Sequence, residues 1–335
     1  MKRILFVCLT ILLSSQMFAQ GNDQNDIFSR FAKWRTSSMK RGCDSSYVQL
    51  PKQSWTLKLN GISSFSRFGI YANDIPGHDN ATLKVGSGFG FKSSVSLAYR
   101  GLELGYSTDQ TNHYDKDMKF GLYSKRIGGE IQYQTFINTN SDLFTGDLPD
   151  SVIHYKNDYI NRLTLNVYYV LNCKTFSYPA AITQSYIQKK SAGSFLLGAS
   201  VFHNKIKPFK NGSDLAILYN PTINLVQAAI GGGYGYNFVC LNSQLLIHLS
   251  AMPMVLFTLK DRVSGAYLGI PYDENFKNTP TLTVISRASI CYTIQDQLII
   301  SLNGVYNRTH SNSDSEIYVT SDGFILQFTL GWRFL

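Results

Sequence analysis

The chain of 335 residues carries a formal net charge of +9, yet charged residues make up only 16% of it, while it contains 21 Tyr, 21 Phe and 26 Gly. Beyond its N-terminus, no segment supplies the roughly 18 consecutive apolar residues of a transmembrane helix, which excludes an ordinary helical membrane protein. Abundant aromatic residues and glycine with few charges instead favour pleated strands flanked by aromatic girdles. No nucleic-acid-binding motif accompanies the positive charge.

Residues 1–19 have the organisation of a signal peptide. A basic start precedes an apolar stretch from Ile4 to Leu13, and we expect cleavage after Ala19. The apolar stretch is too short for a membrane-spanning helix, which needs roughly 20 residues. Cleavage removes Lys2 and Arg3 and leaves a net charge of +7. This charge would draw the exported protein towards lipopolysaccharide phosphate, or it would simply aid solubility.

Residues 20–53 lack the alternation of a strand and are expected to form a periplasmic N-terminal segment. Ile27, Phe31 and Trp34 fall at helical spacing, which predicts one or two short amphipathic helical turns before Pro51.

From residue 54 onwards, apolar residues alternate with polar or small ones, as in transmembrane strands. Phe91, Val95 and Leu97, for example, share one parity, and Ser94 and Ser96 share the other. The pattern predicts an all-β fold, an antiparallel up-and-down transmembrane β-barrel over residues 54–335. About twelve strands are expected, near residues 55–70, 83–99, 102–108, 118–125, 128–138, 159–171, 193–204, 222–239, 243–259, 281–294, 297–309 and 322–334.

The connections between these strands alternate in length. Short ones are predicted at residues 100–101, 126–127, 240–242 and 295–296, and longer ones at residues 71–82, 109–117, 139–158, 205–221, 260–280 and 310–321. Bacterial outer-membrane barrels have short periplasmic turns and long external loops, so the pattern places both termini in the periplasm. A soluble β-sandwich, the alternative fold, has no physical reason to follow this alternation.

One connection breaks the pattern. Residues 172–192 stand where a tight turn is due and contain Tyr178-Pro179. Such a long segment is expected to form an ordered periplasmic insert or to fold into the lumen. An ordinary long turn, or strands drawn in the wrong place, is the alternative.

The last strand ends in alternating aromatic residues, Trp332 and Phe334. This end resembles the terminal signal that the outer-membrane assembly machinery reads, although Leu335 departs from it because that signal finishes on the aromatic residue. A plain hydrophobic terminal strand is the other interpretation.

Two stretches carry a family resemblance: KTFSYPAA at residues 174–181 and QKKSAGSFLLG at residues 188–198. They resemble the signature of an uncharacterised exported bacterial family, described only as a domain of unknown function, whose members look like outer-membrane barrels. Weaker marks are the start at residues 47–51, the central residues 233–238 and the aromatic C-terminus, so the resemblance covers about residue 44 to the end. It implies a barrel-like exported protein and no established activity, and it assigns a role to no residue.

The strand parity also predicts which side chains line the lumen: Arg162, Asn166, Gln227, Asn237, Gln244, His248, Arg287, Asn303, Asn307, Gln327 and Arg333. Arg162, His248, Arg287 and Arg333 are the candidates for ligand binding. The preferred function is passage or binding of a small solute, and a structural or surface-interaction barrel without a conducting pore is the alternative. We expect no cofactor and no metal, because no pair among Cys43, Cys173, Cys240 and Cys291 has metal-ligand spacing. Their disulfide pairing stays open.

A third hypothesis is a lipid-modifying outer-membrane enzyme. Some outer-membrane lipid hydrolases carry a His-x-Ser pair on one strand, and His248 and Ser250 would share a face here. Such hydrolases act at the lipid-facing surface, whereas the parity turns this pair towards the lumen. We therefore predict no catalytic residue.

Overall fold

The computed structural model describes residues 27–75, 78–109, 116–145, 153–207, 222–267, 270–274, 280–310 and 317–335. Contacts divide the chain into a small N-terminal unit that ends at Arg41 and a large unit from Gly42 to Leu335. The small unit contains helix α2 (Ile27–Lys40), which confirms the helical character predicted from Ile27, Phe31 and Trp34, but its 14 residues exceed the one or two turns expected. The predicted signal peptide lies outside the described residues. No described helix is both long enough and apolar enough to cross a membrane.

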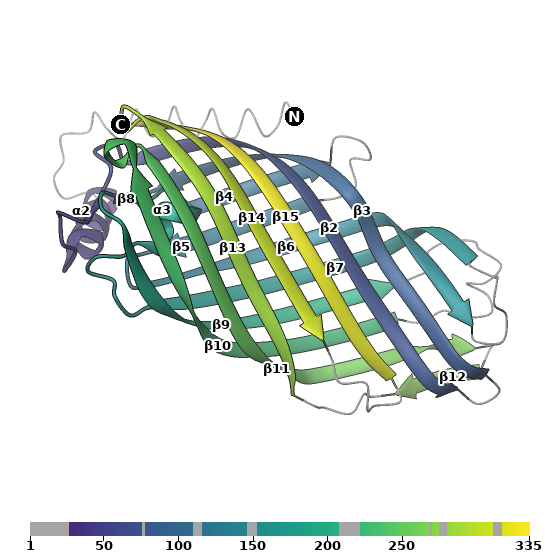
Figure 1. The fold of residues 1–335 in the computed structure, drawn as a ribbon. Helices are drawn as coiled ribbons and strands as arrows, with labels where there is room; N and C mark the ends of the chain where they lie inside the picture. Colours follow the sequence, from purple (N-terminus) through teal and green to yellow (C-terminus); the bar gives the residue numbers. More distant parts are fainter. Residues whose placement is uncertain are drawn as a thin grey trace. The chain divides into compact units, whose positions relative to one another are not determined.

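In the described part of the large unit, twelve antiparallel strands form one closed barrel, as the sequence predicts (Figure 1). The barrel strands are β2 (Trp55–Ile75), β3 (His78–Tyr99), β4 (Leu102–Asp109), β5 (Lys116–Tyr123), β6 (Ile127–Thr145), β7 (Ile153–Val170), β9 (Ala192–Lys207), β10 (Thr222–Cys240), β11 (Leu245–Tyr267), β13 (Thr281–Ile294), β14 (Leu298–His310) and β15 (Ile317–Phe334). A short strand, β12 (Ile270–Glu274), pairs only with the far end of β11.

The barrel closes because the first barrel strand pairs with the last. β2 pairs with β15 over the whole length of β15, and β10 pairs with both β9 and β11, so the ring closes. Closure lets the barrel strands form their backbone hydrogen bonds within the sheet. The soluble β-sandwich alternative is therefore wrong, since a sandwich needs two separate stacked sheets.

Side chains alternate between the outside and the inside of the wall. On β7, Leu163 and Leu165 point outwards and are 41% and 39% exposed, whereas Thr164 points inwards and is 7% exposed. On β9, Phe195 is 66% exposed and Ser194 is 2% exposed. The exterior is thus apolar and much of the interior polar, which confirms the predicted parity.

The tight turns and the C-terminus lie at one end of the barrel. Arg100 and Gly101 have φ of +43° and +79°, and Gln295 and Asp296 have φ of +51° and +59°, as two-residue hairpin turns require. Backbone hydrogen bonds join the turn at Arg100 to Ser54 and Ser54 to Leu335. This end carries the predicted short connections, and we call it the turn end.

The predicted long connection at residues 71–82 is wrong. β2 continues to Ile75 and β3 begins at His78, so only two residues join them. Strand pairing needs backbone hydrogen bonds alone and continues past the last apolar side chain, whereas the sequence pattern shows only the part with an apolar face. β6, β7 and β11 likewise extend further than their apolar stripes.

Candidate functional site

The segment between β7 and β9, residues 171–191, folds into the turn end of the barrel, and we name it the plug. It contains helix α3 (Tyr178–Ile182) and strand β8 (Ile187–Gln188), both drawn at the turn end in Figure 1. Phe176 and Ala181 of the plug are fully buried. Of the two forms predicted for residues 172–192, the segment that enters the lumen is therefore confirmed, and an ordinary long turn is wrong.

Inward-facing side chains from four strands hold the backbone of the plug. The hydrogen bonds run from Lys58 Nζ of β2 to Thr183 O (2.8 Å), from Arg333 Nη2 of β15 to Gln184 O (2.7 Å), from Ser289 Oγ of β13 to Ala181 O (3.2 Å) and from Asn237 Nδ2 of β10 to Ser177 O (2.9 Å). On β7, the ring of Tyr168 packs edge-on against Tyr178 with centroids 4.8 Å apart. Because these strands lie on different sides of the ring, the plug spans the lumen and does not merely line one wall.

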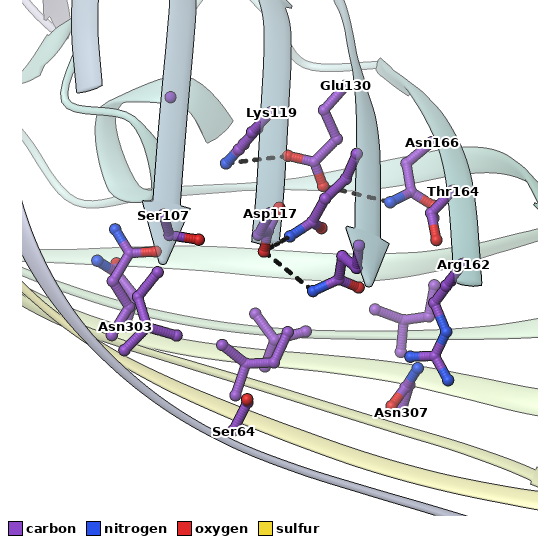
Figure 2. A pocket seen from close by; sticks show the side chains of 18 of the residues that line it. Ser64, Ser107, Asp117, Lys119, Glu130, Arg162, Thr164, Asn166, Asn303 and Asn307 are labelled. Atoms are coloured by element: carbon purple, nitrogen blue, oxygen red, sulfur yellow. Dashed lines mark hydrogen bonds and ion pairs between the residues drawn. The ribbon is translucent and has the colours of Figure 1, made fainter. Parts of the chain in front are cut away.

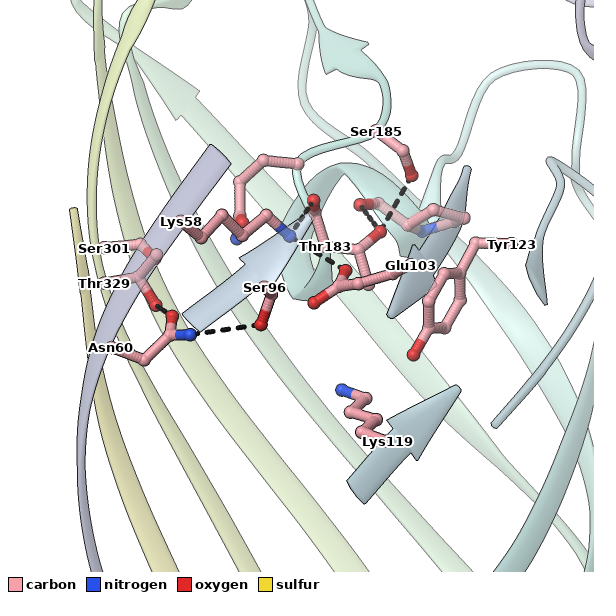
Figure 3. Close-up of polar contacts among 12 residues, drawn as sticks. Lys58, Asn60, Ser96, Glu103, Lys119, Tyr123, Thr183, Ser185, Ser301 and Thr329 are labelled. Carbon is pink, nitrogen blue, oxygen red and sulfur yellow. Dashed lines mark hydrogen bonds and ion pairs between the residues drawn. The ribbon is translucent and has the colours of Figure 1, made fainter. Parts of the chain in front are cut away.

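One anchor is part of a buried ion pair. Lys58 Nζ lies 2.9 Å from Glu103 Oε2 of β4, and both side chains are nearly inaccessible to solvent. Figure 3 shows the Lys58 ammonium between Glu103 and the Thr183 carbonyl. A buried ammonium is tolerated only where an opposite charge and further acceptors surround it. Here the barrel wall supplies the charge and the plug supplies an additional acceptor.

The plug is also ordered from within. Ser177 caps the start of α3, its side chain accepting a hydrogen bond from Ala180 N. The Gln188 side chain accepts a hydrogen bond from Ser177 N at 2.8 Å and donates to Thr175 O and Lys190 O. The buried amide of Gln188 thus fastens the start of α3 to β8 and to the residues that follow it.

The chain that leads into the barrel is attached to the plug. β1 (Val48–Gln49) pairs with β8 in a separate two-stranded sheet. Asp44 N donates to Lys174 O at 3.0 Å, and Lys189 N donates to Tyr47 O at 2.7 Å. Neither β1 nor β8 could be predicted, because two-residue strands leave no periodicity.

His248 lies beneath the plug in a chain of three polar side chains. Its Nδ1 lies 2.7 Å from Asn237 Oδ1, and its Nε2 lies 3.0 Å from Ser250 Oγ. Since the Asn237 amide nitrogen donates to the plug, its oxygen faces His248, which therefore carries its proton on Nδ1 and accepts from Ser250. The plug and His248 thus share Asn237, the plug through its amide nitrogen and His248 through its amide oxygen.

This Ser–His–Asn order has the connectivity of a nucleophilic triad, but the plug covers it. His248 is 1% exposed, and its ring lies against Phe176 and Tyr178 with centroids 6.2 and 5.4 Å away. The pair faces the inside of the barrel, as the parity predicts. Asn237 holds the plug by hydrogen bonds and His248 packs against it, whereas Ser250 contacts His248.

Above the plug, the lumen contains a cavity of about 190 Å³. Ile182 and Gln184 of the plug form part of its boundary, and the remaining lining comes from the barrel strands. Among the described lining residues, five are cationic, Lys58, Lys92, Lys119, Arg162 and Arg287, and three are acidic, Glu103, Asp117 and Glu130. The cavity is closed towards the turn end and carries an excess of positive charge.

Glu130 of β6 organises the charges on one side of the cavity. Its Oε2 accepts from Tyr123 at 2.9 Å and lies 3.2 Å from Lys119 Nζ, and its Oε1 accepts from Asn166 at 3.2 Å and from Arg287 at 3.3 Å. Four donors around one carboxylate satisfy its charge inside the barrel. Arg287 reaches it from β13, so this network crosses the lumen.

The opposite wall of the lumen contains an apolar cluster. Ala229, Met254 and Leu256 are buried there, and Phe202 and Ile285, which line the cavity, pack against them. The cavity therefore offers a charged side and an apolar side. No group of three or more potential metal ligands occurs among the residues that the structure describes.

The structure places each predicted ligand-binding candidate on the inner face of the barrel but divides them between two places. Arg162 and Arg287 line the cavity, where Arg162 donates to Asn204 and to Ser66. His248 and Arg333 contact the plug and lie outside the cavity lining. Of the other predicted lumen residues, Gln244 alone is misplaced, because it follows the turn after β10 and is exposed to solvent.

Sequence reasoning missed the acidic partners and several lysines of the cavity: Lys58, Lys92, Glu103, Asp117, Lys119 and Glu130. All six lie at inward positions of predicted strands or their immediate extensions, so the parity that found Arg162 could have found them. The plug residues had only their excess length as a signal. All four described cysteines are free thiols.

Fold and site together define a class: a twelve-stranded barrel with an apolar exterior, whose polar lumen is closed at one end by a segment of its own chain. Residues 43–334 match the family described as Domain of unknown function (DUF4421), and the chain belongs to this family. The match confirms the resemblance seen in the sequence. Among curated proteins, none matches the chain.

Solved structures with a similar arrangement of strands include outer-membrane proteins. The outer membrane protease OmpT from Escherichia coli is 9% identical, with a TM-score of 0.48 over 85% of this chain and 97% of that chain. The translocator domain of the autotransporter NalP from Neisseria meningitidis is 9% identical, with a TM-score of 0.33 over 92% and 95%. The outer membrane protein OprG from Pseudomonas aeruginosa is 12% identical, with a TM-score of 0.31 over 84% and 97%.

Proposed function

We propose that this protein is an outer-membrane barrel that binds a small polar solute in its lumen and is closed towards the periplasm by its plug. The single observation that carries the proposal is the plug itself, which is anchored to strands on different sides of the ring and forms the boundary of a charged cavity. The protein would thus act as a solute-binding barrel and not as a permanently open pore.

The apolar exterior supports the membrane location. Leu163, Leu165, Phe195, Leu249 and Phe328 are examples of large outward side chains that are between 39% and 66% exposed. A soluble protein seldom exposes a continuous apolar band of this kind, whereas a barrel in lipid requires one. On this proposal the exterior contacts lipid and lipopolysaccharide, the assembly machinery inserts the barrel, and the turn end with the C-terminus faces the periplasm.

The composition of the cavity supports solute binding. It joins charged and amide side chains on one side to an apolar patch on the other, which is the mixture that small-molecule sites use. In a purely structural barrel, the polar side chains of the lumen could all form hydrogen bonds and ion pairs with one another. Two buried polar atoms of this cavity, Asp117 Oδ1 and Asn303 Oδ1, accept no hydrogen bond from any residue that the structure describes.

Conductance in planar bilayers tests closure. We expect the purified parent protein to insert without discrete current steps. A variant in which a Gly-Ser linker replaces residues 176–188 should give steps, because the linker lacks the buried side chains and fixed backbone contacts that hold the plug across the lumen. Both proteins should migrate faster unboiled than boiled on a detergent gel, which controls for folding. Regular current steps from the parent would contradict the proposal.

A binding measurement tests the proposal that the lumen binds a small polar solute. Isothermal titration of the folded parent with small sugars, amino sugars and amino acids should detect at least one ligand. A barrel that is closed but binds no member of this set would instead fit the structural alternative.

A further inference from the structure

Asp117 of β5 is a carboxylate held inside the cavity by neutral partners. It is 7% exposed, and its Oδ2 accepts hydrogen bonds from Gln132 Nε2 at 2.7 Å and Gln134 Nε2 at 3.0 Å. Figure 2 shows both amide groups reaching the same oxygen of Asp117. The two amides fix the orientation of the carboxylate and leave its other oxygen available.

The available oxygen has no partner among the residues that the structure describes. Asp117 Oδ1 is buried and accepts no hydrogen bond, and no described cation lies within salt-bridge distance of this carboxylate. The other two acidic groups of the cavity differ, because Glu103 is paired with Lys58 and Glu130 with Lys119 and Arg287. The charges of Lys92 and Lys119 act on Asp117 from beyond salt-bridge distance and leave Oδ1 without a donor. A positive group from outside the chain that donates to Oδ1 would therefore stabilise the buried carboxylate further.

A second unpartnered group lies next to it. Ser107 of β4 stands directly opposite Asp117 in the sheet, is 2% exposed, and its hydroxyl makes no hydrogen bond in the described structure. Asn303 Oδ1 of β14, also without a donor, lines the same cavity. Each of these groups can accept a hydrogen bond from a ligand.

We infer that Asp117 and Ser107 bind the primary ammonium group of a small polar solute. An ammonium group offers three donors and one positive charge, so it can satisfy Asp117 Oδ1 and Ser107 Oγ together and reduce the cost of burying the carboxylate. A metal ion fits less well, because only one carboxylate is available and no group of three ligands surrounds it.

The remaining charges of the cavity narrow the solute further. Five cationic and three acidic side chains line it, which disfavours a small bare cation overall. The fitting ligand therefore carries its ammonium group on a polar body, with hydroxyl or anionic groups that the cationic lining accepts. Amino sugars and amino acids belong to this class. The inference rests on the proposed function and names the solute class for the same cavity.

Two sugars that differ in a single group test the proposed ammonium site. Glucosamine at a pH where its amine is protonated and glucose differ by an ammonium group in place of one hydroxyl, so titration of the folded full-length barrel with both isolates that group. We expect glucosamine to bind the parent more tightly than glucose. Asp117→Asn, which keeps the shape and removes the charge, should weaken glucosamine binding roughly tenfold to a hundredfold, because one charge-assisted hydrogen bond is lost. Ser107→Ala should weaken it by less.

Asp296→Asn is the matched control, because this carboxylate lies in an exposed turn outside the cavity. It should bind glucosamine as the parent does, and heat modifiability should show that all variants are folded. Equal binding of the two sugars, or an unchanged glucosamine affinity in Asp117→Asn, would overturn the ammonium site and leave solute binding in the lumen intact. If neither sugar nor any amino acid binds the parent, both this inference and the binding half of the proposed function fail.

Discussion

The ion pair between Lys58 and Glu103 shows how single residues control this lumen. Both side chains are almost completely buried, and the Lys58 ammonium also holds the plug through Thr183 O. Removing one partner of a buried pair leaves the other charge uncompensated, which costs far more than the pair contributes. The stability of the barrel and the attachment of the plug therefore depend on the same contact.

We predict that Glu103→Gln lowers the free energy of unfolding by about 3–5 kcal/mol, because Lys58 then stays charged in a buried place. Urea unfolding of the barrel refolded into lipid vesicles measures the change. Asp322→Asn is the control: Asp322 pairs with Arg308 at 3.5 Å, but the two side chains are 38% and 64% exposed. Such an exposed pair contributes about 0–1 kcal/mol. Similar losses of unfolding free energy in both variants would contradict the claim that burial makes the Lys58–Glu103 pair more important for stability.

For a single residue, the sequence predicts whether its side chain faces the inside or the outside of the barrel, but not which side chain it contacts. Alternation placed Arg287 inside the barrel correctly, yet its partner Glu130 stands 157 positions earlier in the chain. That contact exists only because the ring brings β13 and β6 to face each other across the lumen. For the same reason, the pairing of His248 with Asn237 of the neighbouring strand could not be predicted before the register was known.

The plug is the element on which function depends most. Its anchors come from strands far apart in the sequence, and it is too short to fold alone, so the barrel wall must order it. Asn237 is its central anchor, donating to Ser177 O at 2.9 Å and to Gln188 Oε1 at 3.2 Å while it orients His248.

Asn237→Ala should loosen the plug without opening the barrel sheet. Loss of its hydrogen bonds removes about 1–3 kcal/mol from the local stability, so amide hydrogen exchange over residues 177–183 should become roughly tenfold faster or more. Asn307→Ala is the matched control, since Asn307 also faces the cavity but makes no hydrogen bond to the plug in the described structure. Mass spectrometry of peptic peptides measures the exchange, and equal rates in the two variants would show that Asn237 is not an anchor.

The sequence showed that residues 172–192 break the pattern of short turns, but not how this segment folds. A long segment where a tight turn was due indicated an insert, and the buried lumen position was one of two forms that the sequence left open. Its helix α3 has only five residues and β8 only two, which is too short for periodicity to show. Strand ends were mispredicted for a related reason, because pairing beyond the apolar band follows backbone hydrogen bonds and leaves no apolar stripe.

For the whole molecule, the apolar exterior band is the property that the sequence predicts best. Alternation with a period of two is a direct consequence of one apolar face and one polar face, so the number of strands followed from it. Closure into a barrel was favoured by the alternating lengths of the connections. The direct pairing of β3 with β6 beyond the short β4–β5 hairpin was not predictable, because that contact depends on where two other strands end.

We predict that Leu165→Arg reduces the free energy of folding into lipid vesicles by about 2–4 kcal/mol, the cost of a cation on the lipid face near the bilayer midplane. Leu165 pairs with Ile131 and Val201, both outward and exposed, which places it within the apolar band. Leu171→Arg is the control, because Leu171 is also an exposed leucine but lies just past the end of β7 at the turn end. There the cost should fall to about 0–1 kcal/mol. Equal costs at both positions would argue against a membrane belt.

The charges of the lumen lead to a prediction about the barrel without its plug. With residues 176–188 replaced by a Gly-Ser linker, the cavity would become part of a continuous path lined by five cationic and three acidic side chains. Charged side chains that line a pore attract ions of opposite sign, so this variant should prefer anions over cations. The reversal potential across a potassium chloride gradient measures the preference. It should shrink as the salt rises from about 0.1 M to about 1 M, because the screening length falls from about 10 Å to about 3 Å. A cation preference would mean that other charges than these eight control the path.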